Sequence, residues 1–279
     1  MPVTVYERIA SLVSYNPNGL VYHYTTMQNA LEYILYTGTI RLSRLEKVND
    51  PKESKPTYSF SLNNSTTNVE LFEFYERFLT FPKIICLSID NKCYFKNVDD
   101  MNRFPGKGFN HPRMWAQYGE NHRGICFVFD VKRLYSELRI THRKRPIFRG
   151  RVNYSDKYID CNINNESPYS VDLRALGEIG KDKLYIEHLT KFRNTYFFSK
   201  HKDWIDECEY RFVLLDDNSN DVFIDLRTSI VAVILGSEFP MCHKPTLVEL
   251  CKELKIDAFK ISWYQGIANN LNLVYEYEE

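Results

Sequence analysis

The chain has 279 residues, in which 36 Lys and Arg side chains are balanced by 36 Asp and Glu side chains. A formal charge of zero excludes a uniformly basic nucleic-acid coat and an acidic solvating tail, although it leaves room for a local basic patch. With 44% hydrophobic and 15% aromatic residues, the composition is that of a folded globule and not of a disordered chain.

The cysteines and the N-terminus indicate a cytoplasmic protein. Seven cysteines occur without any C-x-x-C spacing, and several stand inside apolar runs such as 84–87. This pattern is typical of buried thiols in a reducing compartment. The first residues lack the apolar core of a signal peptide, and no run approaches the roughly 20 apolar residues that span a bilayer. We therefore expect a cytoplasmic location and no membrane partner.

Periodicity and turn residues predict the elements of the first half. In chain order they are a helix over 4–14, a strand over 20–24, a helix capped by Thr25 or Thr26 and ended by Gly38, a strand over 39–43, a polar loop over 48–53, a helix over 69–81 with Phe72, Tyr75, Phe78 and Leu79 facing inward, a strand over 83–89, a long loop over 90–110, and a short helix over 111–118 capped by Asn110.

The second half continues with a strand over 124–130, a basic run over 139–151, a long helical stretch at about 170–200, strands over 207–215, 222–225 and 230–235, a helix over 246–254, and strands over 256–262 and 271–277. The alternation predicts an α+β fold with a compact mixed or antiparallel β core flanked by helices. We expect a single domain over 1–279, in which the stretch 170–200 is the segment that could form a sub-lobe.

One polar motif lies at the end of an early strand, and a second lies in the loop after the next strand. Tyr22-His23-Tyr24-Thr25 precedes a helix, whose N-terminal amides favour an anion, so His23 or Tyr24 could orient a sugar or stack on a base. A buried structural histidine beside a capping threonine is the alternative. In Asn49-Asp50-Pro51-x-Glu53, the amide and two carboxylates could supply a general base or metal ligands. The alternative is an Asx-type turn.

Two further motifs lie in the second half of the chain. Trp115 and Tyr118 share a helix face, so they could wall a pocket around a planar ring or belong to the core. His122 stands in the following turn and is a candidate acid, base or hydrogen-bond donor.

On a strand, Glu207, Glu209 and Arg211 would point to one face. They form either a solvated face with a Glu209–Arg211 pair, or a cleft in which a glutamate polarises a hydroxyl and Arg211 holds a phosphate.

The basic run contains six cations and no acid between 139 and 151, namely Arg139, Arg143, Lys144, Arg145, Arg149 and Arg151. It could contact nucleic acid or a nucleotide phosphate, or it could be a solvated face. No P-loop, G-x-G-x-x-G, G-x-S-x-G or H-E-x-x-H motif occurs, so P-loop enzymes, classical hydrolases and zinc proteases have no local support.

Taken in order, Tyr22-x-Tyr24-Thr25, Asn49-Asp50-Pro51-x-Glu53, Trp115-x-x-Tyr118 and Trp204-x-x-Glu207-x-Glu209-x-Arg211 resemble a bacterial family known only as a domain of unknown function. The resemblance spans about 22–236. Members of that family occur in abortive-infection and phage-defence loci, which implies a defence or toxin effector. The family often has an aromatic residue at the position of Lys52, and this departure puts a hydrophobic role there in doubt.

The layout is also similar, more weakly, to that of ADP-ribosyltransferases. That similarity implies that His23 holds the ribose of NAD, Ser43 lines the nicotinamide pocket, Glu209 is the catalytic glutamate, and Glu207 orients the acceptor.

Three functions remain open. The first is an NAD-using ADP-ribosyltransferase or NAD glycohydrolase, acting on a protein or nucleic-acid target. The second is a nucleotide sensor without turnover, in which Trp115 and Tyr118 stack on a base and Arg211 binds phosphate. The third is a metal-dependent nuclease that uses Asp50, Glu53 and Glu209. The residues chosen as ligand contacts are Tyr24, Thr25, Ser43, Asn49, Asp50, Glu53, Trp115, Tyr118, His122 and Arg211. No metal site is predicted.

Overall fold

The computed structural model describes residues 19–56, 58–61, 68–91, 104, 106–156, 167–175, 180–217 and 220–277, together with residues 7, 10 and 12. Within these ranges ten strands form one sheet in the order β11-β2-β4-β1-β5-β12-β13-β14, while β10 pairs with the other edge of β4 and carries β6. All of these pairs are antiparallel except β12 with β13. The predicted α+β fold with a mixed, mainly antiparallel β core is therefore confirmed.

The strands of this sheet are β1 (Leu20–Thr25), β2 (Thr39–Arg44), β4 (Pro82–Ile89), β5 (Ile125–Asp130), β6 (Ile147–Arg151), β10 (Glu209–Leu215), β11 (Val222–Asp225), β12 (Ile230–Leu235), β13 (Asp257–Tyr264) and β14 (Ile267–Tyr275). Two small parallel pairs lie outside it, namely β3 (Ser59–Ser61) with β8 (Ser170–Asp172), and β7 (Asn153–Tyr154) with β9 (Ser199–Lys200).

The α-helices are α2 (Pro51–Ser54), α3 (Asn68–Thr80), α4 (Pro112–Gln117), α5 (Val131–Thr141), α7 (Lys181–Lys191), α8 (Arg193–Phe197) and α9 (Lys244–Leu254). A π-helix, η1, covers Asn29–Leu35, and short 3₁₀ helices cover Leu45–Lys47, Leu173–Ala175, Lys202–Glu207 (η5) and Met241–His243.

One edge of β4 is shared between two strands. On that edge β1 pairs only with positions 88 and 89, and β2 pairs only with positions 83 and 84. Residues 85–87 consequently have no strand partner there among the described strands, although β10 pairs along the whole opposite edge. The sheet therefore opens between β1 and β2, above the middle of β4.

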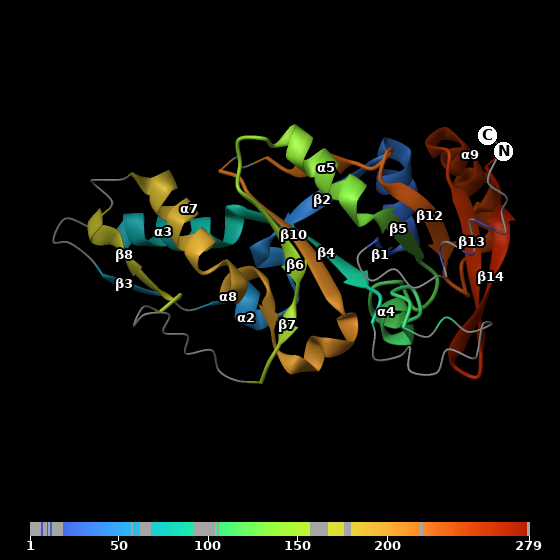
Figure 1. Ribbon diagram of the computed structural model, residues 1–279, viewed down its shortest axis with the longest axis horizontal. Helices are drawn as coiled ribbons and strands as arrows, with labels where there is room; N and C mark the ends of the chain where they lie inside the picture. The colour runs from blue at the N-terminus through green and yellow to red at the C-terminus, as the bar shows by residue number, and fades with distance from the viewer. Residues whose placement is uncertain are drawn as a thin grey trace.

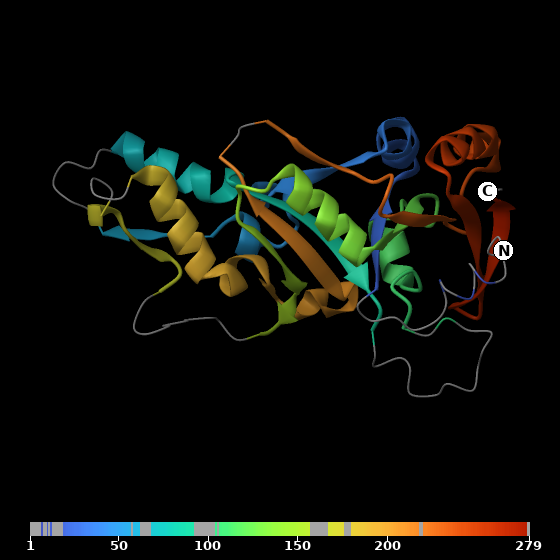
Figure 2. The ribbon, with the colours of Figure 1, turned by 45° about the horizontal axis from the view of Figure 1, so that its top comes forward.

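The two faces of the sheet pack differently. On one face, η1, α5 and α9 bury a single apolar cluster. On the other face, one cluster gathers around α3, α7 and α8, and a second gathers around α4, β13 and β14. In Figure 1 and Figure 2 these last two groups lie at opposite ends of the molecule. Glu209 and Arg211 of β10 lie on this face between the two clusters, so the polar residues interrupt an otherwise apolar layer.

Most predicted strands are confirmed, including those at 20–24, 39–43, 83–89 and 230–235. The helical stretch predicted at about 170–200 is confirmed only in the two separate helices α7 and α8, because the strands β8 and β9 lie at its two ends. The strand predicted over 207–215 begins at Glu209. Glu207 ends a 3₁₀ helix, and the backbone of Cys208 has a left-handed conformation with φ 46°.

Two finer predictions are also wrong. Phe72 is 62% exposed, whereas Phe74 is 2% exposed, because the buried face of α3 runs through Phe74 and Phe78. Asn110 does not cap α4; its side-chain amide donates to the Phe104 carbonyl at 2.7 Å, and His111 occupies the N-cap position. The helix predicted over 4–14 lies almost entirely outside the described residues, as does part of the loop over 90–110.

In the part of the chain that is described, no helix has the length and apolar character needed to cross a membrane.

Candidate functional site

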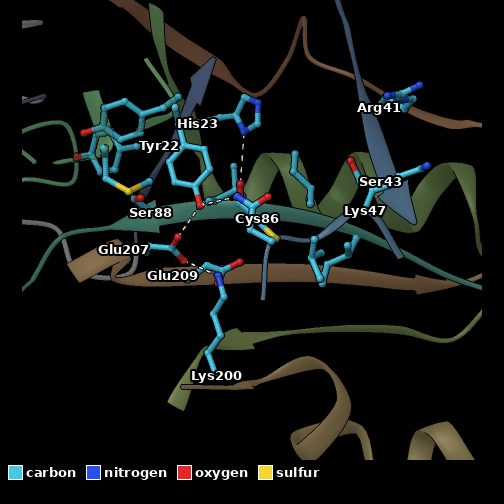
Figure 3. A pocket seen from close by; sticks show the side chains of 18 residues that line it. Tyr22, His23, Arg41, Ser43, Lys47, Cys86, Ser88, Lys200, Glu207 and Glu209 are labelled. Carbon is cyan, nitrogen blue, oxygen red and sulfur yellow. Dashed lines mark hydrogen bonds and ion pairs between the residues drawn. The ribbon is translucent and has the colours of Figure 1, made fainter. Parts of the chain in front are cut away.

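A cavity of about 250 Å³ lies at the opening between β1 and β2. Because the sheet is open there, side chains from both of its faces reach the same space. Figure 3 shows Glu207, Glu209 and Lys200 on one side of this pocket, and Arg41, Ser43 and Lys47 on the other. The lining residues are Tyr22, His23, Tyr24, Arg41, Ser43, Lys47, Val48, Asn49, Ile84, Ile85, Cys86, Leu87, Ser88, Met114, Tyr118, Lys200, Glu207 and Glu209.

Several predicted site residues that are far apart in the sequence line this one pocket. They are His23, Tyr24, Ser43, Asn49, Tyr118, Glu207 and Glu209. They come from β1, β2, the loop before α2, the end of α4, η5 and β10. The opening in the sheet is what brings these segments together, since each of them ends or turns beside the uncovered part of β4.

Glu207 is at the centre of a hydrogen-bonded group in the pocket. Its Oε1 accepts from the Tyr118 hydroxyl at 2.6 Å, and its Oε2 accepts from the Lys200 ammonium at 2.5 Å. The Tyr118 oxygen in turn accepts from the Asn49 amide at 3.0 Å. Burial, together with the bond to Glu207, raises the pKa of the Tyr118 hydroxyl, so it remains protonated and donates.

Glu209 is held by Arg211, two residues further along the same strand. The guanidinium Nε and Nη2 donate to the two oxygens of Glu209 at 2.6 and 2.8 Å. Nη2 also donates to Glu53 at 2.9 Å, and Nη1 donates to Glu53 and to the Phe197 carbonyl. All five N–H donors of arginine are thereby used. Since Arg211 is fully buried, it holds protein carboxylates and does not line the pocket.

Lys200 and Glu209 are both charged in this environment. Burial acts to raise the pKa of Glu209, but the positive charges of Arg211 and Lys200 outweigh it, so the net shift is downward. Burial acts to lower the pKa of Lys200, but Glu209 and Glu207 outweigh it and raise that pKa. With Glu53 included, three carboxylates face two cations. The formal count is one negative charge in excess, and burial raises the pKa of Glu53, the carboxylate of this cluster that does not line the pocket.

His23 lies on the other side of β4 from the carboxylates (Figure 3). Its Nδ1 is 3.3 Å from the carbonyl oxygen of Cys86, which can only accept, so Nδ1 carries the proton. Burial lowers the pKa of His23, which favours the neutral ring. The Nε2 atom is then an acceptor, suited to a ligand hydroxyl.

Asp50 and Glu53 support the site without lining it. Asp50 caps α2, its Oδ1 accepting from the Lys52 amide at 2.9 Å and its Oδ2 from the His201 amide at 3.3 Å. Glu53 is bound to Arg211. In the described ranges no group of three His, Cys, Asp or Glu side chains could hold a metal ion. Asp50, Glu53 and Glu209 therefore do not form the ligand set that the nuclease hypothesis requires.

Other predicted contacts belong to the core. Trp115 is fully buried, donates from Nε1 to the Phe109 carbonyl at 2.8 Å, and meets Tyr24 edge to face. Of the two alternatives for this pair, the core position therefore holds for Trp115, whereas Tyr118 lines the pocket. The backbone of His122 has a left-handed conformation with φ 66°, and its ring stacks beside Trp115. Thr25 is buried at the end of β1. None of these three residues lines the pocket.

Sequence reasoning missed Lys200, Tyr22, Ser88, Cys86, Met114, Arg41 and Lys47, all of which line the pocket. Lys200 is the most consequential omission, because its ammonium contacts both Glu207 and Glu209. It lies on the two-residue strand β9, inside a stretch predicted to be helical. Tyr22 could have been found, since it directly precedes the chosen His23 in the same strand.

Comparison with known proteins bears on the second half of this site. Residues 114–212 match the model of a family described as a protein of unknown function, DUF2971. The matched span includes Tyr118, Lys200, Glu207 and Glu209, whereas His23 lies outside it. The expected domain of unknown function is thus confirmed over a shorter range than 22–236. No curated protein matches the chain, and no solved structure matches it, an ADP-ribosyltransferase included.

Proposed function

We propose that this DUF2971 protein binds the nicotinamide-ribose end of NAD in the pocket. It would cleave the bond between nicotinamide and ribose, as a glycohydrolase or an ADP-ribosyltransferase. The observation that carries the proposal is the pair of buried carboxylates, Glu207 and Glu209, on one wall of a cavity also lined by hydroxyl groups. A volume of about 250 Å³ is slightly below the range of about 300–1,000 Å³ typical of ligand sites. It suits one ribose with its base better than a whole dinucleotide.

The chemistry requires a negative environment. When the bond between ribose C1′ and the nicotinamide nitrogen breaks, its electron pair stays on that nitrogen, and neutral nicotinamide leaves. The ribose ring then carries positive charge, which fixed carboxylates stabilise most effectively in a site that excludes water. The excess negative charge of the Glu53, Glu207 and Glu209 cluster supports this role. An acceptor hydroxyl or water then attacks C1′, and its proton passes to Glu207.

The remaining polar residues fit the same ligand. The neutral His23 offers Nε2 to a ribose hydroxyl, and Ser43 and Ser88 lie along the lining. Arg41 and Lys47, on the other side of the pocket, can face the diphosphate. The similarity of layout to ADP-ribosyltransferases assigns related roles to His23, Ser43 and Glu209.

The test measures nicotinamide release by the purified chain, with and without bacterial or phage lysate as a source of an activator. We expect release by the wild type, loss of at least about 100-fold in Glu209→Gln, consistent with removal of a main electrostatic contact, and a smaller loss in Tyr118→Phe, which removes a single hydroxyl. Glu187→Gln, at an exposed ion pair on α7, is the matched control. The proposal is wrong if the wild type releases no nicotinamide under any of these conditions.

A second candidate is a nucleotide sensor without turnover. It is favoured by the contacts of Glu209, since Arg211 engages both of its oxygens and Lys200 lies 3.3 Å from Oε2. Such a carboxylate is well placed to fix a hydroxyl and less free to react. A sensor predicts a rise in melting temperature with nucleotides and no release of nicotinamide.

The resemblance to families in abortive-infection loci suggests a defence role for either activity. In that role, expression of the wild type during phage infection stops bacterial growth, and expression of Glu209→Gln does not. Equal growth with both chains would contradict a toxin that depends on this pocket.

A further inference from the structure

A second cavity lies on the opposite side of the sheet from the carboxylate cluster, between β1, β4, β10 and α5. It measures about 230 Å³, and its walls are aliphatic side chains of β1, β4 and α5 together with the ring of Tyr210. Lys132 of α5 and Arg149 of β6 complete the lining, and both side chains are exposed. We refer to Lys132, Arg149, Tyr210 and Tyr135 as the α5–β6 groove. None of these residues lines the NAD pocket.

Arg149 is the member of the basic run that belongs to the α5–β6 groove. Arg149 and Arg151 are opposite Phe212 and Tyr210 in the antiparallel pair of β6 with β10, so both arginines lie on the face covered by α5. Arg139 of α5 and the following Arg143 and Lys144 are also exposed. Arg145 is only partly exposed, and it pairs with Asp216 and Asp217.

The fold brings aromatic rings from other segments beside the basic run. The Arg149 guanidinium lies 4.0 Å from the centre of the Tyr135 ring, and the half-buried Tyr210 forms part of the cavity wall. Among the described strands, β6 has β10 as its partner, and its other edge has no partner within the described ranges. Cations therefore border a slot with an aromatic wall.

We propose that the α5–β6 groove binds single-stranded nucleic acid, with one base in the slot against Tyr210 and the adjacent phosphates on Lys132 and Arg149. Each nucleotide of a single strand offers both a planar ring and a negative charge, which are the two features that the groove can hold. A duplex keeps its bases stacked inside, so it offers no base to the slot. An acidic peptide lacks the planar base that would fill the slot, and a membrane surface cannot enter a slot of this size.

The test uses fluorescence anisotropy with labelled 20-nucleotide oligo-U and oligo-dT at several salt concentrations. Each phosphate contact in a single strand contributes about 0.7 to the slope of log affinity against log salt. The double variant Lys132→Gln/Arg149→Gln should therefore lower the slope by about 1.4, which weakens binding roughly 25-fold at 0.1 M salt. Tyr210→Leu should weaken binding at least about 5-fold with an unchanged slope, because it removes stacking and no charge.

The control is Lys183→Gln/Lys252→Gln, which removes two cations from exposed ion pairs elsewhere. It should bind like the wild type. Thermal melting establishes that each variant is folded. The double variant changes only exposed side chains, so it tests the proposed binding on its own if Tyr210→Leu is unstable. The proposal is overturned if the wild type binds no oligonucleotide at 50 mM salt, if the double variant keeps the wild-type slope, or if a duplex, polyglutamate or anionic vesicles bind as tightly as the single strands.

Discussion

At the scale of single residues, Arg211 connects two elements that are far apart in the chain. It joins Glu53 of α2 to Glu209 of β10, with its side chain fully buried. Removing the guanidinium would leave Glu53 buried without the arginine that it pairs with, and Glu209 with Lys200 in place of two cations. We expect Arg211→Met to lower the free energy of unfolding by about 3–5 kcal/mol, as measured by urea denaturation.

A matched control separates burial from charge in that experiment. Arg227 also pairs with an aspartate, but its side chain is 58% exposed. Arg227→Met should cost no more than about 1 kcal/mol, since exposed ion pairs contribute little. A similarly small loss in Arg211→Met would contradict the view that the cluster around Glu209 is shielded from water.

His23 makes the pH dependence of the folding stability testable. Burial lowers its pKa from the ordinary value of 6.5, so the unfolded chain takes up the proton more readily than the folded one. Stability is then fully present above about pH 6.5 and decreases as the pH falls toward the folded-state pKa. In the wild type, burial gives His111, His122 and His142 the same direction of shift.

We therefore expect the free energy of unfolding to fall between pH 7 and pH 5, and to fall less steeply in His23→Gln. The difference in slope should be at most about 1.4 kcal/mol per pH unit. Urea denaturation of both proteins at several pH values measures it. Parallel pH curves would mean that His23 does not resist protonation in the folded protein.

At the scale of elements, the segment after β4 fixes one wall of the pocket between β1 and β2. Asp90 accepts from the Gly108 amide at 2.9 Å and from the buried Lys107 ammonium, and the Tyr24 hydroxyl donates to the Gly108 carbonyl at 2.7 Å. A Cβ atom on Gly108 would lie 2.2 Å from the Tyr22 ring. Since Tyr22 lines the pocket, space at Gly108 controls the shape of that wall.

Gly108→Ala should thus lower stability by about 1–3 kcal/mol, the usual cost of overpacking, and weaken nucleotide binding as well. Gly150→Ala is the control, because its Cβ would make an ordinary contact 3.5 Å from the Phe198 ring. Denaturation and nucleotide-dependent melting of both variants provide the comparison. If Gly108→Ala behaves like Gly150→Ala, then the packing of Tyr22 does not shape the pocket.

Elements with a strong local pattern could be predicted from the sequence, and elements set by distant contacts could not. The apolar run over 83–89 and the glycine at position 38, with φ 66°, were sufficient to place a strand and a helix end. In contrast, the alternation of charged and apolar residues over 207–212 conceals the left-handed backbone of Cys208, which separates Glu207 from the strand that begins at Glu209.

The same distinction applies to the candidate site. Polar residues at strand ends, such as His23 and Ser43, were found because their neighbours fix their position. Whether Trp115 faces the core or the pocket depends on how α4 packs, which local spacing does not determine. Lys200 could not be recognised, because the partners that make it important come from η5 and β10.

At the scale of the whole molecule, the apolar clusters share strands. Ile84, Val213 and Leu215 belong to the cluster with α3, α7 and α8. Their immediate neighbours Ile85 and Leu214, on the same two strands, belong to the cluster with η1, α5 and α9. The helices near 181–197 therefore cannot separate from the sheet without exposing β4 and β10 on one face.

This sharing leads us to expect one cooperative unfolding transition in calorimetry, with equal calorimetric and van't Hoff enthalpies. Leu189→Ala in α7 and Leu247→Ala in α9 remove side chains that are 1% and 0% exposed, from different clusters. Each should cost about 2–5 kcal/mol and shift the same single transition. If Leu189→Ala instead produces an early, separate transition and Leu247→Ala does not, the α3–α7–α8 region unfolds as its own unit, and the prediction of a single domain over 1–279 is wrong.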